Sequence, residues 1–397
     1  MSIYGGIPHY ANEKYFDAIY DCSDNATMLL WEKATEEMMH SYTSQLEELS
    51  FTKHQELDDP CVHSATYYKE QLSIHTYYLK KRAQLRVIVQ KDAVLPINDY
   101  DYQKVCDVAV TQTGLYNDPN IYTSMGYLIR LEDGTFVVID GGKDVDSHAE
   151  LLYNTMLEQK PDGVDSIVIS AWILTHGHSD HYGVLRNFLR NYNDKVTVKM
   201  LIGNDISDVT YQGCAWGRNF NYSIVSERFE GCCYMKAHTG QQFRFPGVTM
   251  TVLYTHEDYF PDMMRNYNDT SIVVDAVIQG EITEKPIKKG ETRFVFLADI
   301  HPDGAQRLIN AYGAYMRCDI MQISHHGIGP SLYDLYAMCN PRIAYWPCGR
   351  AVLTYKDGAR LQRPHLKYLL ETTDQIIYRT DESHTFFFDS KDKKENT

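Results

Sequence analysis

The stretch "LTHGHSDHYG", Leu174 to Gly183, places three histidines and one aspartate within six positions. It continues the apolar run "SIVISAWIL", which predicts a buried β-strand that ends at the motif. Side chains two positions apart in an extended chain point the same way, so His176 and His178 can meet one metal ion. Asp180 and His181 follow where the chain enters a predicted helix, and they can meet a second ion. The spacing therefore predicts a metal centre at a strand end, unlike the i, i+4 histidine pair of a helical HExxH site.

The segments around this motif alternate between strand and helix patterns. Residues 126–142 predict a strand, an Asp-Gly turn and a second strand that ends at Asp140. Further strands are expected at residues 166–174, 195–202, 242–254, 271–278, 292–298 and 319–324. Helices are expected at residues 147–159, 182–192, 302–315 and 331–339. This alternation predicts an α/β domain over residues 105–390, followed by a polar tail at 391–397.

The first hundred residues carry a different pattern. Residues 23–49 predict a helix, because apolar side chains recur there at helical spacing: Leu30, Ala34, Met38, Tyr42 and Leu46. Short strands are expected between residues 64 and 90. We therefore expect a small α+β domain over residues 1–104, without recognisable chemistry of its own, through which the protein could form an oligomer.

Composition narrows the class of protein. The chain has 397 residues, 44% of them hydrophobic, which is enough for a large core. Its net charge of -15 argues against a stable nucleic-acid partner or an anionic membrane surface. Nine scattered cysteines without a CxxC pair predict reduced thiols, and no signal peptide or membrane span is expected. We expect a cytoplasmic protein that acts on a small-molecule substrate.

The motif "THGHSDHYG" resembles the HxHxDH signature of the metallo-β-lactamase superfamily. Other landmarks of that superfamily follow in order: Asp140 in "VVIDGG", Asp299 in "FVFLAD", and His325 or His326 in "MQISHHG". "NDTSIVV" and the HHG run are most similar to the branch with the DNA-uptake competence protein's hydrolase domain and bacterial phosphorylcholine esterases. The resemblance covers about Val105 to Phe388 and implies a four-layer αββα sandwich.

By this resemblance, His176 and His178 bind a first metal, and Asp180 and His181 bind a second. Asp299 would bridge the two. His325 is expected to complete the second site, because it follows the strand directly. Many relatives supply one more histidine to the first site, and the histidines in the corresponding interval are His238 and His256; if neither binds, that site keeps open positions. Nitrogen and oxygen donors favour two zinc ions, with manganese or iron as alternatives.

The resemblance also implies roles in catalysis. Two ions bridged by a carboxylate lower the pKa of a shared water, and the resulting hydroxide attacks the substrate. The expected catalytic residues are Asp180, His326, which would protonate the leaving group, and His365, near the site's mouth. Asp140 is expected to orient a ligand histidine, and His301 to start a helix. Candidate anion-binding groups are Lys143, Arg350 and Lys356.

The expected function is hydrolysis of a phosphodiester-like small molecule. Hydrolysis of a lactone, thioester or amide is the main alternative, because one fold hosts several chemistries. A non-catalytic scaffold stabilised by its metals is a further alternative, and the intact set of metal-ligating residue types argues against it.

Overall fold

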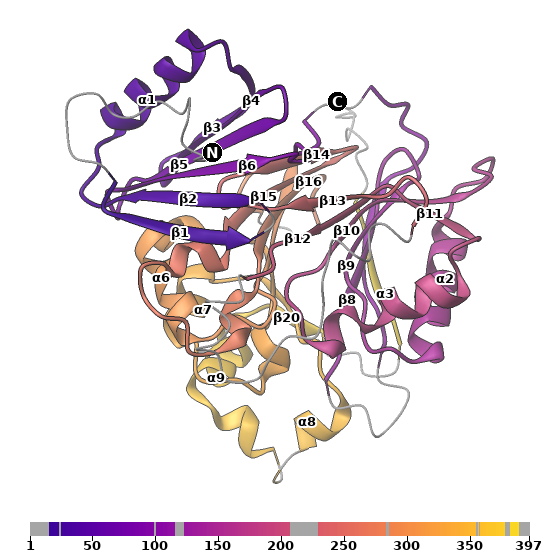
Figure 1. Cartoon of the computed structure of the whole chain (residues 1–397). Coiled ribbons are helices and arrows are strands. Elements are labelled where there is room, and N and C mark those ends of the chain that lie inside the picture. The colour runs from indigo at the N-terminus through magenta and orange to yellow at the C-terminus, as the bar shows by residue number, and fades with distance from the viewer. Residues whose placement is uncertain are drawn as a thin grey trace, which may run out of the picture.

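The computed structural model describes residues 16–23, 25–98, 101–115, 123–206, 229–282, 286–354, 356, 358–377 and 382–388. Three sheets and their helices make up this part of the chain (Figure 1). The expected polar tail at 391–397 lies outside the described residues.

The first large sheet has eight strands, one of which leads directly into the motif at residues 174–183. Its order is β13-β12-β10-β9-β8-β7-β21, and β11 also pairs with β10. The strands are β7 (Val108–Gln112), β8 (Gly126–Arg130), β9 (Phe136–Asp140), β10 (Ile167–Ile173), β11 (Val196–Val198), β12 (Met200–Gly203), β13 (Cys233–Lys236) and β21 (His384–Phe388). The β8–β9 hairpin and the parallel β9–β10 pair are the elements that residues 126–174 predicted.

The second large sheet has seven strands in the order β14-β15-β16-β17-β18-β19-β20. They are β14 (Gln242–Phe245), β15 (Val248–Tyr254), β16 (Val273–Gln279), β17 (Glu291–Phe296), β18 (Ile320–Gln322), β19 (Ile343–Tyr345) and β20 (Gln375–Ile377). The strands from β14 to β17 are antiparallel, and those from β17 to β20 are parallel. Parallel pairs need crossover helices, which cover one face of this sheet.

Buried apolar side chains define four layers. One core cluster joins the inner faces of the two large sheets, with members such as Ile173 and Phe294. A second lies between the first sheet and the helices α2 (Asp146–Gln159) and α3 (Ser179–Asn191). A third lies between the second sheet and α6 (Pro302–Tyr312), α7 (Tyr333–Cys339) and α9 (Pro364–Thr372). The expected αββα sandwich is therefore confirmed.

The shorter helical segments connect these layers. They are η1 (His256–Tyr259), η2 (Tyr267–Thr270), η3 (Gly313–Met316), η4 (Ser324–Gly327), α8 (Arg350–Thr354) and η5 (Ala359–Gln362). The η2 and η4 turns follow or precede strands of the second sheet and contribute to the site described below.

The N-terminal region forms a third sheet, β1-β2-β6-β5-β4-β3, with one helix. Its elements are β1 (Ala18–Ser23), β2 (Ala26–Trp31), α1 (Glu36–Glu48), β3 (Thr52–Asp58), β4 (Val62–Lys69), β5 (Leu72–Leu79) and β6 (Gln84–Lys91). The prediction of one helix over residues 23–49 is wrong in its first part, where β2 pairs with both β1 and β6. A short apolar run fits either a helix or a strand buried on both faces. Here the pairing with two neighbouring strands favours the strand.

The N-terminal sheet packs on the sandwich through a shared core. Alternate strand residues face opposite sides: Val87 packs under α1, whereas Ile88 joins the cluster that holds α6, α7 and α9. Buried hydrogen bonds cross the same contact, including His75 Nε2 to the Thr239 carbonyl at 2.8 Å and the Tyr77 hydroxyl to Asp258 at 3.0 Å. In Figure 1 this sheet lies across one end of the second large sheet.

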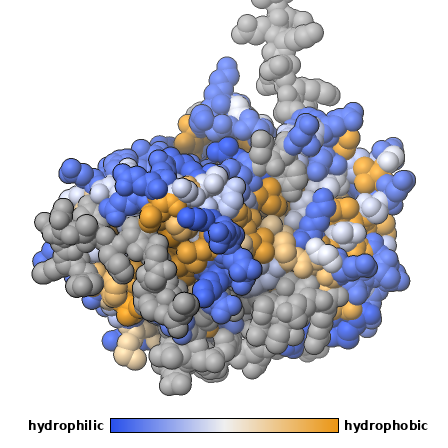
Figure 2. All heavy atoms as spheres, turned by 45° about the horizontal axis from the view of Figure 1, so that its top comes forward, coloured by the Kyte–Doolittle hydropathy of each residue, from blue (hydrophilic) through white to orange (hydrophobic). Residues whose placement is uncertain are grey.

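The outer surface mixes hydrophilic side chains with hydrophobic areas. Figure 2 shows this on the face seen when the top of Figure 1 turns forward. Scattered apolar side chains are normal on a folded protein. Within the described ranges, none of the helices combines the length and the apolar character needed to cross a membrane. The cysteines of the same ranges are free thiols.

Candidate metal centre and adjoining pocket

The opening motif forms the link between β10 and α3. His176 lies in the loop after β10, His178 occupies the N-cap position of α3, and Asp180 and His181 fall in the first turn of that helix. Two close backbone approaches hold this path. A Cβ on Gly177 would lie 2.4 Å from the Tyr267 hydroxyl, and one on Gly183 would lie 2.2 Å from the Asp144 nitrogen.

The first group of potential ligands comprises His176, His178 and Asp299. The nitrogens His176 Nε2 and His178 Nδ1 lie 3.0 Å apart, and His176 Nε2 lies 3.9 Å from Asp299 Oδ2. Asp299 follows β17 of the second sheet, so this group joins the ends of both large sheets.

The second group comprises Asp180, His181 and His326. His326 Nε2 lies 3.5 Å from Asp180 Oδ2. The same Asp299 Oδ2 atom lies 3.2 Å from His181 Nε2 and 3.5 Å from His326 Nε2. Asp299 therefore contacts both groups, as a bridging carboxylate must.

Hydrogen bonds fix which nitrogen of each ring faces this centre. His181 Nδ1 lies 2.7 Å from Asp140 Oδ2, and His326 Nδ1 lies 2.8 Å from the Pro347 carbonyl. A carbonyl only accepts, and an ionised carboxylate only accepts, so each Nδ1 carries a proton. Both Nε2 atoms and Asp299 Oδ1 are buried, and within the described residues they have no hydrogen-bond partner. These donor atoms fit metal ions, which would satisfy them.

The charges of the centre are strongly coupled. Burial raises the pKa values of Asp180 and Asp299, but the neighbouring histidines outweigh it and hold both well below the usual range. Burial lowers the pKa of His326, yet Asp299 and Asp180 raise it to about 9. Burial and the neighbouring histidines lower the pKa of His176. Cations beside the carboxylates would take the place of the histidine protons, because a histidine must be deprotonated to bind metal.

The positions of His325 and His326 differ from the expectation. His326 lies in the second group, whereas His325 is partly exposed and its Nδ1 lies 2.8 Å from His301 Nε2. Both residues adopt left-handed backbone, with φ of 49° and 53°. The preference for His325 depended on its place directly after the strand, but the backbone leaves the extended conformation at this residue. The left-handed turn directs the second histidine inward.

A pocket of about 550 Å³ adjoins the centre. Its lining includes His301, His325, Arg363 and His365. His365 is buried, which lowers its pKa to about 4, and burial likewise lowers the pKa of His325 to about 4. His365 thus lies in the lining of this pocket together with His325, and its catalytic role stays a prediction. The lining does not include the candidate anion-binding groups Lys143, Arg350 and Lys356. It includes Arg363 instead, which no sequence pattern had indicated.

The two candidate extra ligands of the first site lie elsewhere. His238 Nδ1 contacts Glu257 at 3.0 Å, and its ring stacks on His75 of the N-terminal sheet. His256 is buried with its Nε2 3.3 Å from the Asp205 carbonyl. Neither belongs to a group of potential ligands in the described part of the chain. The first group therefore has two histidines and Asp299.

Two further residues of the site were missed as functional residues. The Asn268 amide lies 3.2 Å from His301 Nε2, and the Tyr267 ring lies 5.2 Å from the His178 ring. Both belong to η2, which contains the start of the "NDTSIVV" run. That run was a signal, but only as a resemblance, because nothing in its spacing predicts contact with a histidine cluster distant in sequence.

The family comparison agrees with the first part of this site. Residues 122–214 match the family model described as "Metallo-beta-lactamase superfamily". This segment contains Asp140 and the whole motif from His176 to His181, so the match covers the part of the chain that supplies these residues. No curated protein sequence matches significantly.

Several solved structures are similar at low identity. The metallo-β-lactamase fold protein YhfI from Bacillus subtilis is 13% identical, with a TM-score of 0.40, over 70% of this chain and 99% of that chain. CmlA, a diiron β-hydroxylase from Streptomyces venezuelae, is 9% identical, with a TM-score of 0.40, over 73% and 55%. A long form RNase Z from yeast is 9% identical, with a TM-score of 0.33, over 64% and 38%. Similarity at this level carries no information on activity.

Proposed function

We propose that the protein is a dinuclear metal-dependent hydrolase that acts on phosphodiester-like small molecules. The observation that carries this proposal is the convergence of two groups of ligand-type side chains on the Asp299 carboxylate. Buried imidazole nitrogens without a described hydrogen-bond partner face the same space. Leaving these buried polar atoms without a partner would cost folding free energy, and this argues for bound cations.

The ligand assignment follows the two groups. His176, His178 and Asp299 would hold one ion, and Asp180, His181 and His326 the other, with Asp299 shared. When bound, a pair of divalent ions lowers the pKa of water and stabilises charge on the oxygens of the reacting group. Nitrogen and oxygen donors favour zinc, and manganese or iron also suit them.

The charges of the pocket lining favour an anionic substrate. Arg363 supplies a positive charge, and its NH1 is held by the carbonyls of Ile328 and Gly329 at 2.9 and 2.7 Å. His325 and His365 are neutral at pH 7, with pKa values of about 4, so neither adds a negative charge that would oppose an anion. A phosphodiester carries a negative charge that these groups can bind, whereas a lactone or thioester does not.

The first experiment combines metal content with turnover. Elemental analysis of the purified chain should give about two divalent ions per molecule. Bis-(p-nitrophenyl) phosphate should be hydrolysed faster than an acyl ester, and chelation should abolish this activity until metal is restored. Faster hydrolysis of the acyl ester would move the proposal to the lactone and thioester class. Absence of bound metal would overturn it.

The adjacent histidines offer a matched pair of variants. His326→Ala should lose about one metal ion per chain together with turnover. His325→Ala should keep the metal and lose turnover only in part, because His325 lines the pocket. Loss of metal from His325→Ala alone would reverse the assignment. His178→Ala and Asp180→Ala should each abolish turnover while the protein stays folded, which circular dichroism can verify.

A further inference from the structure

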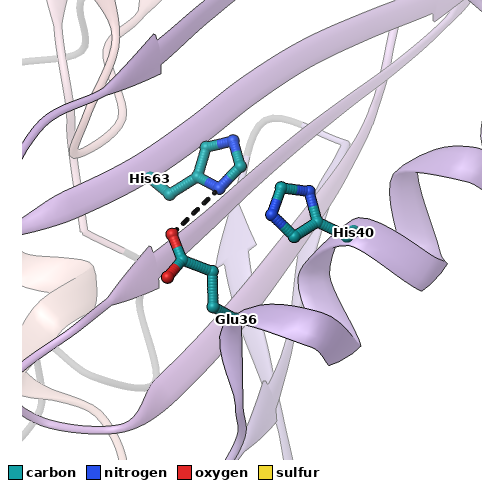
Figure 3. A group of neighbouring side chains, drawn as sticks. All are labelled: Glu36, His40 and His63. Atoms are coloured by element: carbon teal, nitrogen blue, oxygen red, sulfur yellow. Dashed lines mark ion pairs between the residues drawn. The ribbon is translucent and has the colours of Figure 1, made fainter.

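A second kind of ligand cluster lies in the N-terminal unit, apart from the proposed hydrolytic centre. Glu36 and His40 come from α1, and His63 comes from β4 beneath it (Figure 3). One potential ligand atom from each lies within 4.8 Å of the other two. The metallo-β-lactamase match does not reach these residues.

Local structure brings the three side chains to one side. Glu36 and His40 are four residues apart on α1, so they share one helix face. The helix begins at Glu36 because the Thr35 hydroxyl accepts a hydrogen bond from the Met38 nitrogen at 3.3 Å. His63 lies on β4 two residues before Ala65, which packs in the cluster beneath α1, so His63 faces the same way.

The hydrogen bond of His63 leaves one nitrogen facing the cluster. His63 Nε2 lies 3.0 Å from Glu56 Oε1, and a carboxylate accepts, so Nε2 carries the proton. Nδ1 then has a lone pair. This atom is buried, only 2% of the residue is exposed, and Nδ1 has no hydrogen-bond partner within the described ranges. A carboxylate behind the distal nitrogen is the usual support of a metal-binding histidine.

The distance across the cluster suits a cation. His63 Nδ1 lies 3.6 Å from Glu36 Oε1, which is too long for a hydrogen bond. Two atoms that both carry lone pairs face each other there. Zinc bonds of about 2.0–2.1 Å place neighbouring tetrahedral ligands roughly 3.3 Å apart, so little movement would be needed. The His40 and His63 rings, 4.9 Å apart and inclined at 59°, are not stacked and can both turn toward one ion.

Other charges around the cluster leave room for this ion. Lys80 Nζ lies 3.0 Å from Glu36 Oε1, but it also pairs with Asp58 at 2.6 Å and keeps that partner if Glu36 turns to a metal. Lys53 pairs with Glu56 at 2.8 Å. Lys53 also lies 3.4 Å from Glu47, so four carboxylates face two ammonium groups and the local charge remains negative.

We propose that Glu36, His40 and His63 bind a divalent transition-metal cation, with zinc as the best chemical fit. Two imidazoles and one carboxylate are a common zinc set, and water can complete it on the exposed side of His40. Bound metal would fasten α1 to the sheet, independently of the hydrolytic centre.

The test is zinc stoichiometry of the full chain in zinc-buffered solution. His40→Ala and Glu36→Gln should each bind one zinc fewer per chain than the wild type, with affinity at this site reduced more than about 100-fold, since even supporting residues cost 10–100-fold. Glu37→Gln on the same helix and His54→Ala on β3 are the matched controls and should bind as the wild type does. His40 is exposed and Glu36 partly exposed, so neither substitution empties a core position.

Thermal unfolding gives a second readout. Zinc should raise the Tm of the wild type by several degrees more than that of His40→Ala, because binding stabilises only the folded state. The comparison should hold in a His178→Ala background, which separates this site from the hydrolytic centre. Equal zinc content and equal Tm shifts in wild type, His40→Ala and Glu36→Gln would overturn the proposal.

Discussion

Asp140 shows how one residue can join two strands and a histidine. It ends β9 in left-handed backbone, with φ of 60°, and is fully buried. Its carboxylate accepts from the Thr175 nitrogen at 2.9 Å and from the Thr175 hydroxyl, and it holds His181 Nδ1 at 2.7 Å. It therefore sets both the end of the β10 loop and the direction of His181 Nε2.

Asp140→Asn should uncouple these roles. An amide can still accept from Thr175, but it no longer offers His181 two acceptor oxygens or a negative charge. We expect affinity for the second metal ion to fall about 10–100-fold, with a similar loss of turnover. Competition with a chromophoric chelator measures this. Asp144→Asn is the control, because the Asp144 pair with Arg190 is exposed and contributes little. Unchanged affinity in Asp140→Asn would contradict the assigned role.

The orientation of the left-handed pair His325–His326 could not be predicted from the sequence. The run "MQISHHG" predicts that one of two histidines binds metal. Strand alternation, however, cannot be extended through residues with φ near 50°. Likewise His238 lies in the expected sequence interval, but its ring stacks on His75 of another sheet. Such contacts depend on the packing of distant segments.

The helix α3 depends on a close approach to the loop after β9. Gly183 lies on its buried face, and the Gly142 and Val184 backbones bond across the same contact at 3.0 Å. Because His181 lies two residues before Gly183 on the same helix, the position of the helix sets the positions of the proposed metal ligands Asp180 and His181.

Gly183→Ala should therefore affect both stability and the site. The added Cβ would meet the Asp144 nitrogen at 2.2 Å, and backbone yields less easily than a flexible side chain. We expect a loss of about 1–3 kcal/mol in unfolding free energy and weaker metal binding. Urea unfolding and metal titration test this. Arg190→Ala on the exposed side of α3 should change stability by less than about 1 kcal/mol. A wild-type unfolding curve for Gly183→Ala would refute the argument.

At the level of elements, the sequence predicted most of the sandwich. Residues 126–174 carry a hairpin turn and continuous apolar runs, and the structure has β8, β9 and β10 there. Ala26–Trp31 could not be separated from the helix that follows it, because short apolar runs fit either state. The three-residue strands β18, β19 and β20 are too short to show a period and owe their pairing to the sheet around them.

Buried hydrogen bonds join the N-terminal sheet to the sandwich beside their shared apolar core. His75 takes part in them, with Nδ1 2.9 Å from the Thr66 hydroxyl and Nε2 2.8 Å from the Thr239 carbonyl. Burial lowers the pKa of His75 to about 3, and burial also lowers the pKa of His256 to about 3. Both rings are neutral in the folded protein at physiological pH.

This burial predicts a loss of stability in acid. In the unfolded chain a histidine titrates near 6.5, so below that pH the unfolded state takes up protons that the folded state refuses until about pH 3. The unfolding free energy is therefore highest above pH 6.5, where neither state binds these protons, and it declines as the pH falls below that value. At pH 5 each of these two histidines should lower the unfolding free energy by roughly 2 kcal/mol relative to its value at neutral pH.

The variant His75→Gln isolates one of these contributions. An amide can keep both hydrogen bonds without titrating. Between pH 7.5 and 5.0 the variant should lose about 2 kcal/mol less unfolding free energy than the wild type, as measured by urea denaturation. Parallel pH profiles for the two proteins would show that His75 does not titrate on unfolding.

The two sides of the shared core are synthesised at different times, because they are far apart in the sequence. One face of the N-terminal sheet carries Met28, Val62, Tyr77 and Ile88, and these side chains belong to the core cluster that also holds α6, α7 and α9. The ribosome makes that face early, and its covering helices emerge only after residue 302. Until then an apolar strand surface faces water, which invites aggregation in a growing chain. We expect this nascent segment to need a holding chaperone until its covering helices arrive.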